Sequence, residues 1–191
     1  MNPLGPIRNG TAQAAIALGS NLGDSAALIA EALDRLGTVG EAVPLAVAPI
    51  EITARSPLYQ TAPVGPPQPE FLNGCALLTT TLSPGQLLHQ LLAIEMQMGR
   101  VRQRRWGPRL IDIDLILYND QVVGTPELTL PHPRMHERAF VLVPLSDIAA
   151  DWVHPILGLT VSELVTQVDC SGVNIYTDSA LATVDNGRTI A

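Results

Sequence analysis

The chain has 191 residues, of which 47% are hydrophobic and 15% charged, a composition typical of a globular domain with one substantial core and not of a disordered chain. A formal net charge of −7 argues against a sequence-independent nucleic-acid binder, and no apolar run approaches the length of a membrane span. The N-terminus lacks a basic start followed by an apolar stretch, and the two cysteines form neither a disulfide framework nor a zinc spacing, so a cytoplasmic location is expected.

The first part of the chain predicts a flexible arm, a strand, a glycine loop and a helix. Residues 1–12 contain two prolines and two glycines and are expected to form the arm. Residues 14–18 read as a short buried strand, and residues 19–24 form a tight loop that ends at Asp24, the expected N-cap of a helix closed by Gly37. The apolar residues of this helix recur at helical spacing: Ile29, Ala32, Leu33 and Leu36. Such a junction suits an anion, although the loop alone is more often a plain turn.

The middle of the chain predicts two more strands and a second helix. Residues 50–59 alternate as a strand, and residues 62–70 contain four prolines, which indicates a stiff exposed loop that is either a connector or part of a binding site. Residues 71–82 predict a strand with Phe71, Asn73, Cys75 and Leu77 on one face. The amide of Asn73 must find hydrogen-bond partners in the backbone or in a planar heterocycle. Residues 83–99 begin with a capping box and predict a helix.

The stretch that follows joins a cluster of arginines to a pair of aspartates. Five arginines lie between Arg100 and Arg109 with no acid among them, and a strand is expected over residues 110–118. Asp112 and Asp114 then lie about 6.5 Å apart along one strand face, where they could bind hard cations or form salt bridges with the arginines. The alternation assigns Ile111, Ile113, Leu115 and Leu117 to one face and Asp112, Asp114, Ile116 and Tyr118 to the other. Carboxylates beside guanidinium groups suit a cation-bound polyphosphate.

The order of elements predicts the fold class. Strand, helix, strand, strand, helix and strand form the βαββαβ core of an α+β, ferredoxin-like sandwich: an antiparallel sheet with helices packed on one face, followed by C-terminal additions. We expect a single domain over residues 13–170 and a disordered tail over residues 171–191. In the additions, His132 lies between two prolines and either donates to a phosphate or caps a turn. Residues 140–145 form a compact apolar anchor.

Six motifs in order resemble the 6-hydroxymethyl-7,8-dihydropterin pyrophosphokinase family. They read ALGSNLGD, SPLYQTAPVG, FLNGCA, GRVR, RWGPRLIDIDLILY and LTLPHPRMHERAFVLVPL, and the resemblance covers Ile16 to Ala150. It implies the ferredoxin-like fold and transfer of pyrophosphate from ATP to the hydroxymethyl group of the pterin, with release of AMP, in folate biosynthesis.

The resemblance also implies roles for individual residues. The catalytic residues would be Arg100, Arg109, Asp112 and Asp114, the two aspartates holding two Mg²⁺ ions. ATP would be bound by Arg102, Arg105, His132 and Arg138. The pterin would be bound by Thr61, Val64, Phe71, Asn73, Trp106 and Phe140, with the two phenylalanines on either side of its ring and Trp106 closing from a mobile loop. Positioning and cations should do most of the catalysis, so no essential general base is expected.

Two other readings compete with the enzyme. One is a catalytically silent pterin- or nucleotide-binding module on the same fold, which would not need both aspartates together with Arg100 and Arg109. The other is an RNA-binding sandwich, against which stand the negative net charge and the lack of clustered aromatic residues on a strand. The expected partners are therefore small molecules, ATP and the pterin, bound by a monomer that contacts neither nucleic acid nor membrane.

Overall fold

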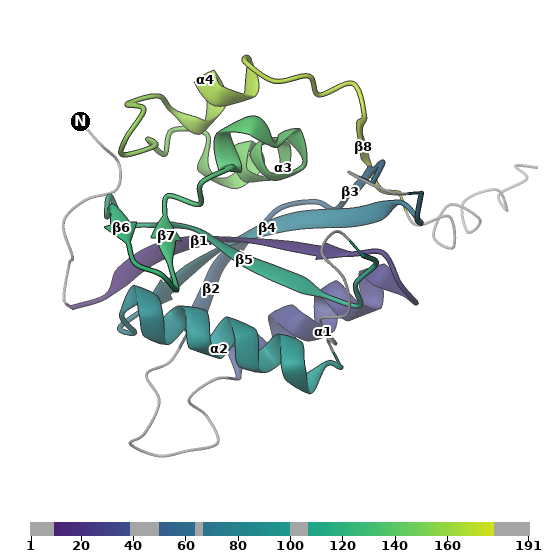
Figure 1. Cartoon of the computed structure of the whole chain (residues 1–191), viewed down its shortest axis with the longest axis horizontal. Helices are drawn as coiled ribbons and strands as arrows, with labels where there is room; N and C mark the ends of the chain where they lie inside the picture. The colour runs from purple at the N-terminus through teal and green to yellow at the C-terminus, as the bar shows by residue number, and fades with distance from the viewer. Residues whose placement is uncertain (1–9, 39–49, 64–66, 100–106, 178–191) are drawn as a thin grey trace, which may run out of the picture.

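The computed structural model describes residues 10–38, 50–63, 67–99 and 107–177. Within these residues a six-stranded sheet runs through the centre of the molecule (Figure 1). Its strands are β1 (Ala12–Ser20), β2 (Ile50–Arg55), β3 (Tyr59–Thr61), β4 (Phe71–Thr80), β5 (Asp112–Tyr118) and β8 (Val173–Ile175). The strand order is β5-β1-β4-β3-β8, β2 also pairs with β4, and all these pairs are antiparallel.

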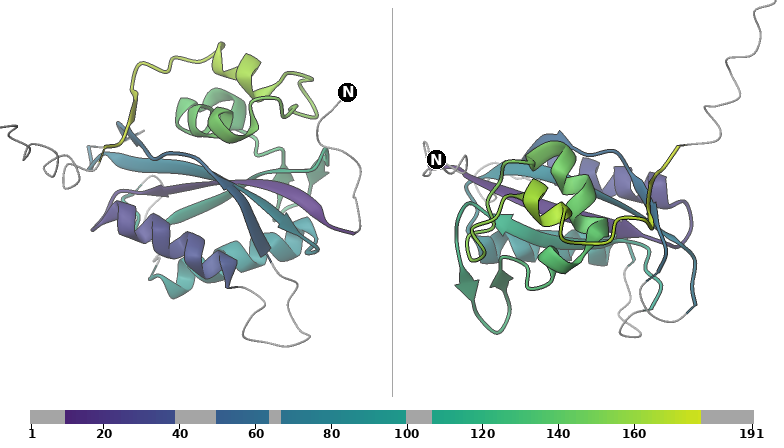
Figure 2. Two further views of the ribbon diagram at one scale, coloured as in Figure 1. Left: turned by 180° about the vertical axis from the view of Figure 1, so that it is seen from behind. Right: turned by 90° about the horizontal axis from the view of Figure 1, so that it is seen from above.

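Two helices cover one face of the sheet, as expected for a ferredoxin-like sandwich. They are α1 (Ser25–Gly37) and α2 (Pro84–Gln97), and both lie below the sheet in Figure 1 and in the view from behind in Figure 2. The predicted caps are confirmed: the Asp24 carboxylate accepts a hydrogen bond from the Ala27 amide at 3.0 Å, and Ser83 and Gln86 form a capping box.

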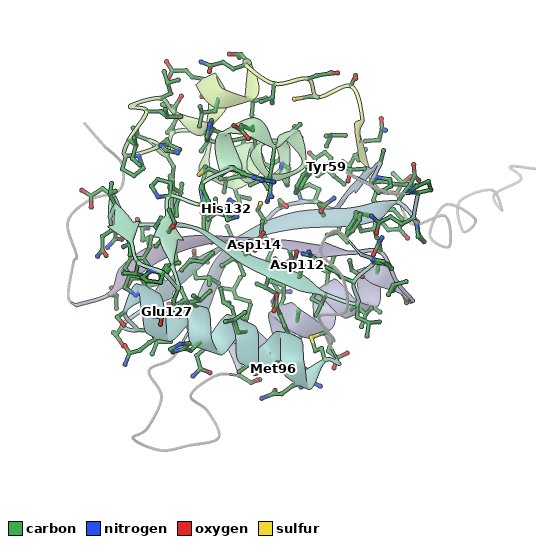
Figure 3. The ribbon with its side chains drawn as sticks, in the orientation of Figure 1. Tyr59, Met96, Asp112, Asp114, Glu127 and His132 are labelled. Carbon is green, nitrogen blue, oxygen red and sulfur yellow. The ribbon has the colours of Figure 1, made fainter. Side chains whose placement is uncertain are left out.

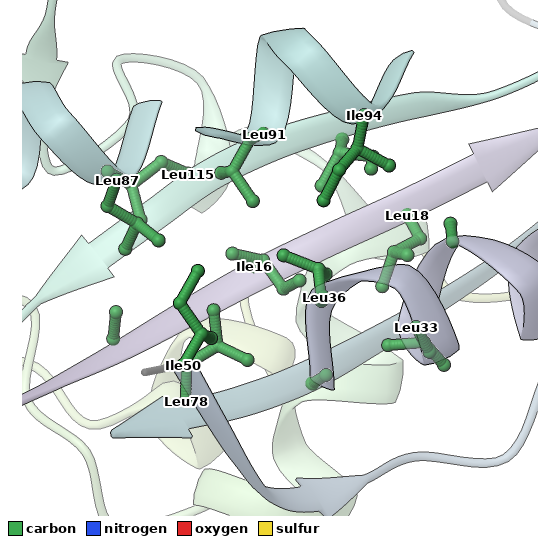
Figure 4. Packing of buried hydrophobic residues seen from close by; sticks show 14 of the residues in the cluster. Ile16, Leu18, Leu33, Leu36, Ile50, Leu78, Leu87, Leu91, Ile94 and Leu115 are labelled. Carbon is green, nitrogen blue, oxygen red and sulfur yellow. The ribbon is translucent and has the colours of Figure 1, made fainter. Parts of the chain in front are cut away.

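The first hydrophobic core lies between this helix pair and the sheet (Figure 4). Leu33 and Leu36 of α1 and Leu87 and Leu91 of α2 pack against strand residues such as Ile16 of β1. Because every one of these side chains is removed from water, their burial supplies the main driving force that holds the two helices on the sheet. The predicted α+β fold class is thus confirmed.

The C-terminal additions cover the opposite face of the sheet. A short 3₁₀ turn η1 (Met135–Glu137) leads into α3 (Ala139–Ala149), which is followed by α4 (Val161–Val165). The predicted apolar anchor at residues 140–145 is therefore a helix. Its hydrophobic residues are not confined to one stripe and it contains Pro144, so no helical period marks it in the sequence. Its buried side chains form a second core with Cys75, Leu77 and Ile116 of the sheet.

A β-bulge in β5 corrects the predicted assignment of its last residues. Ile16 pairs with Leu115 while Ala15 pairs with Leu117, so the register shifts by one residue. An extra residue in one strand reverses the faces that follow it. Leu117 consequently joins the core under α3, and Tyr118 joins the core under α1 and α2, the reverse of the simple alternation.

The predicted ends of the domain also need correction. β1 begins at Ala12, inside the expected arm, and residues 173–175 form β8 where a disordered tail was expected. β8 pairs with β3, and the Tyr176 amide donates to the Leu58 carbonyl at 2.8 Å. This pairing satisfies backbone groups at the edge of the sheet, which the polar composition of the segment does not reveal. Residues 1–9 and 178–191 lie outside the described residues.

Two smaller features complete the fold. The expected strand over residues 50–59 is divided into β2 and β3, and between them the Ser56 hydroxyl accepts a hydrogen bond from the Cys75 amide at 2.9 Å. A two-stranded sheet of β6 (Val123–Gly124) and β7 (Thr129–Leu130) precedes His132. Among the described helices, none combines the length and the apolar character that crossing a membrane would require.

Candidate active site

A cleft opens on the face of the sheet that carries α3, where β1, β4 and β5 meet the start of this helix. It brings together residues that are far apart in the sequence. Some were predicted to bind ATP and metal ions, and others were predicted to bind the pterin. Its lining includes Gly19, Thr61, Gln68, Phe71, Asn73, Arg109, Asp112, Asp114, Arg138 and Phe140. Eight of the predicted site residues therefore line a single cleft.

The two aspartates lie on one face of β5, as predicted, and each has a cationic neighbour. Arg109 forms an ion pair with Asp112 through Nη1. Asp114 Oδ2 lies 3.8 Å from Arg138 Nη1 and 4.0 Å from His132 Nε2. Figure 3 shows both aspartates along β5 with His132 between this strand and α3. The carboxylates remain partly exposed, so both are accessible to a ligand in the cleft.

His132 is held by its backbone and by its ring. Its amide donates to the Ile116 carbonyl of β5 at 2.9 Å, and its Nδ1 accepts a hydrogen bond from the Arg134 amide at 3.2 Å. The proton of the neutral ring must therefore be on Nε2, the atom that faces Asp114. Burial, together with the charges of Arg138 and Arg134, lowers the pKa of His132 to about 4. The residue thus caps a turn and also directs a neutral N–H donor toward Asp114.

The cleft is also lined by an amide and by two aromatic rings. Asn73 is buried, and its Nδ2 donates to the Thr61 hydroxyl at 2.7 Å. Phe71 and Phe140 both line the cleft, and the Arg138 guanidinium carbon lies 5.5 Å from the centroid of the Phe140 ring. A pocket lined by two rings and a fixed amide suits a flat heterocycle.

Five predicted site residues cannot be placed. Arg100, Arg102, Arg105, Trp106 and Val64 lie outside the described residues. Their roles remain predictions.

Two residues behind the cleft were missed by the sequence interpretation. Glu95 of α2 is only 2% exposed, and its Oε1 accepts a hydrogen bond from the amide of Ile113, between the two aspartates of β5. Its position was detectable, because Leu87, Leu91 and Glu95 follow one another at intervals of four on the buried side of the helix. The second is Asn21, a buried amide in the loop between β1 and α1.

Fold and cleft together define the chain as an α+β enzyme of the phosphoryl-transfer type, with paired carboxylates and cations beside an aromatic pocket. The model of the 7,8-dihydro-6-hydroxymethylpterin-pyrophosphokinase (HPPK) family matches residues 15–150. The chain belongs to this family.

Named relatives agree with this assignment. The chain is 47% identical over 161 residues to the 2-amino-4-hydroxy-6-hydroxymethyldihydropteridine pyrophosphokinase of Synechocystis sp., covering 84% of this chain and 78% of the relative. It is 45% identical over 162 residues to the protein of the same name from Methylorubrum extorquens, covering 84% of this chain and 96% of the relative.

Solved structures agree on the fold. The wild-type HPPK-DHPS of Plasmodium falciparum with pteroate superimposes with a TM-score of 0.65 at 17% identity, over 85% of this chain and 43% of that one. The present chain therefore spans less than half the length of that longer protein. At this identity the likeness concerns the fold alone.

Proposed function

We propose that this cleft binds magnesium-bound ATP at the β5 carboxylates and hydroxymethyl-dihydropterin between Phe71 and Phe140, side by side. The chain is an ATP-dependent pyrophosphokinase, which transfers the pyrophosphoryl group of ATP to the hydroxymethyl oxygen of 6-hydroxymethyl-7,8-dihydropterin and yields AMP and the pterin diphosphate, a step of folate biosynthesis. One observation carries the site assignment: Asp112 and Asp114 line the same cleft as Asn73 and the two phenylalanines.

The donor set fits magnesium. Mg²⁺ prefers hard oxygen ligands and is commonly bound by one or two carboxylates together with substrate phosphates and water. Asp112 and Asp114 offer such carboxylates on one strand face, and we propose that they hold two ions with the triphosphate. When bound, magnesium supplies positive charge to the phosphate oxygens and makes the hydroxymethyl group more acidic.

The protein cations bind and orient the phosphate chain. Arg109 and Arg138 each lie beside one aspartate, so their guanidinium groups can hydrogen-bond phosphate oxygens next to the metal-binding carboxylates. His132 adds a neutral Nε2–H donor at Asp114. Its other ring nitrogen is already occupied by the Arg134 amide, which supports a role as donor and not as general base. Arg100, Arg102 and Arg105 are proposed to complete the phosphate site.

The pterin half positions the hydroxyl that receives the pyrophosphoryl group. The rings of Phe71 and Phe140 would enclose the heterocycle, and Asn73, oriented by Thr61, would hydrogen-bond its edge. Val64 and Trp106 are proposed to complete this pocket. Holding both substrates in a reactive orientation replaces an encounter in solution by a reaction within one complex, which is where most of the rate enhancement should arise.

The direct test is to mix the protein with ATP, MgCl₂ and 6-hydroxymethyl-7,8-dihydropterin and to separate the nucleotides by chromatography. We expect AMP that depends on the pterin and on magnesium. ADP in place of AMP, or no pterin-dependent turnover, would overturn the assignment, and binding without turnover would identify the silent module. We also propose that the chain works as a cytoplasmic monomer; a larger mass in sedimentation equilibrium with both substrates present would contradict the monomer.

A further inference from the structure

The buried amide of Asn21 joins two segments that are distant in the sequence. The residue as a whole is 4% exposed. The side-chain Oδ1 accepts a hydrogen bond from the backbone amide of Arg109 at 2.8 Å. The backbone amide of Asn21 donates in turn to the Arg109 carbonyl at 3.1 Å. On the other side, Nδ2 donates to Gln68 Oε1 and to the Pro69 carbonyl, both at 3.1 Å. Both donors and the acceptor of this one amide are thus used.

Each segment that Asn21 holds leads into one half of the cleft. Arg109 lies three residues before the start of β5 and pairs with Asp112, so it belongs to the phosphate half. Pro69 lies two residues before β4, which carries Phe71 at its first position and therefore belongs to the pterin half. Asn21 lies just beyond the end of β1, the strand between β4 and β5. A single side chain consequently connects the backbones that enter the two substrate sites.

We propose that Asn21 is a positioning residue that keeps the phosphate half and the pterin half of the site at the reactive separation. It touches neither substrate and acts through the backbone of Arg109 and through the Pro-rich segment at residues 67–69. The inference rests on the proposed side-by-side binding of the two substrates. Its consequence is specific, because Asn21 is not among the residues that line the cleft and should affect only the relative placement of the two halves.

The hydrogen bonds of Asn21 should affect the rate of turnover more than the affinity for either substrate. A displacement of about 1 Å between reacting groups can cost on the order of 100-fold in rate, even when each substrate still binds. We therefore expect Asn21→Ala to lower kcat by roughly 10- to 100-fold while the KM values for ATP and for the pterin change by less than about threefold.

The isosteric variant Asn21→Asp separates the two contacts. Its carboxylate can still accept a hydrogen bond from the Arg109 backbone amide but cannot donate one to the Pro69 carbonyl, so the direct link to the backbone of the Pro-rich segment is lost. We expect kcat to fall here too. Turnover at the wild-type rate would show that this link does not matter for catalysis and would overturn the proposal.

Asn119 provides a matched control at the opposite end of β1. It is also a buried asparagine: its Oδ1 accepts from the Gln13 amide at 2.8 Å, and its own amide donates to the Gln13 carbonyl at 2.7 Å. Asn119 therefore connects the end of β5 to β1, just as Asn21 connects the segment before β5 to the end of β1. Unlike Asn21, it lies away from the cleft. Asn119→Ala should lower the melting temperature and leave kcat per folded molecule unchanged.

The experiment measures kcat, both KM values, the melting temperature and calorimetric affinities for each substrate alone. A fall in kcat for both Asn21 variants with retained affinities, and none for Asn119→Ala, supports the proposal. An equal fall for Asn119→Ala, or a loss of affinity for one substrate with kcat retained, overturns it. If Asn21→Ala does not fold, Asn21→Asp decides alone. A wild-type protein that binds both substrates but forms no AMP would refute the proposed function instead.

Discussion

Asn73 and Asp112 pair with the same residue, Gly19, from opposite sides of β1. Both side chains line the cleft, Asn73 in the proposed pterin half and Asp112 in the proposed phosphate half. A Cβ atom at position 19 would lie 3.0 Å from Asn73 Oδ1 and 3.9 Å from Cδ1 of Phe71. The backbone of β1 thus forms the floor between the two halves, at a residue that has no side chain.

Replacing Gly19 by alanine tests the importance of this space. The added methyl group would press on the amide of Asn73, and overpacking of this kind costs about 1–3 kcal/mol. We expect the dissociation constant of the pterin to rise about 10-fold or more, measured by calorimetry with magnesium and a non-hydrolysable ATP analogue. Gly85→Ala in α2 is the control, because a Cβ there would meet nothing within 4 Å. Unchanged pterin affinity in Gly19→Ala would show that Asn73 can move aside.

Neutralising the carboxylates should separate turnover from pterin binding. Asp112→Asn and Asp114→Asn keep the side-chain size but remove the negative charge that a metal ion requires. We expect kcat to fall by at least roughly 100-fold, as when electrostatic stabilisation of a transition state is removed, with the pterin affinity of the protein alone within a few-fold of wild type. Stopped-flow turnover measures kcat, and fluorescence titration measures the dissociation constant of the pterin. Equal losses of kcat and of pterin affinity would contradict the proposal that the two substrates occupy separate half-sites.

The features that the sequence predicted correctly depend on neighbours in the chain. The Asp24 cap and the Ser83 capping box each involve residues within one helical turn of each other. The shared face of Asp112 and Asp114 follows from the two-residue period of a strand. The bulge that moves the Tyr118 side chain to the other face of the sheet depends instead on the register in which β5 pairs with β1. The pairing of β8 likewise depends on an edge that only the folded sheet presents.

The supporting residues of the site were missed for the same reason. The partners of Asn21 are 47 to 88 residues away, and the partner of Glu95 is 18 residues away. Residue type alone could not distinguish Asn21 from a turn residue, since asparagine is common in turns. A family resemblance identifies residues that would touch substrates, whereas the hydrogen bonds that hold those residues become apparent only in three dimensions.

Removing the carboxylate of Glu95 should destabilise the protein. Glu95→Leu would leave the buried amide of Ile113 without its acceptor, and an unsatisfied buried polar group costs about 1–3 kcal/mol. We expect the free energy of unfolding in urea to fall by about that amount, and Glu95→Gln, which retains an acceptor oxygen, to lose less. Met96→Ala is the neighbouring control, because Met96 is 68% exposed and such substitutions stay within about 0.5 kcal/mol. Equal stability of Glu95→Leu and wild type would show that another group satisfies Ile113.

The pH dependence of stability should involve His154, which closes the turn before α4. Its Nδ1 accepts hydrogen bonds from the amides of Ile156 at 3.3 Å and Leu157 at 3.2 Å. Burial, and then the neighbouring His136, lowers the pKa of His154 below its ordinary value. The unfolded chain therefore binds a proton more readily than the folded one. The stabilising contribution is complete above the unfolded pKa of about 6.5 and is lost as the pH falls from there through the lower folded pKa.

We accordingly expect the melting temperature, measured without metal ions and nucleotide, to be flat from pH 7.5 to 8.5 and to fall between pH 7 and pH 5. His154→Asn places an amide oxygen where Nδ1 accepts, so it keeps an acceptor for Ile156 and Leu157 but cannot be protonated. Its melting temperature should fall less steeply over this interval, the remaining slope coming from groups such as His132, whose pKa is also lowered. His89→Asn, at an exposed position of α2, should retain the full slope. Identical slopes for wild type and His154→Asn would mean that protonation of His154 does not contribute to acid unfolding.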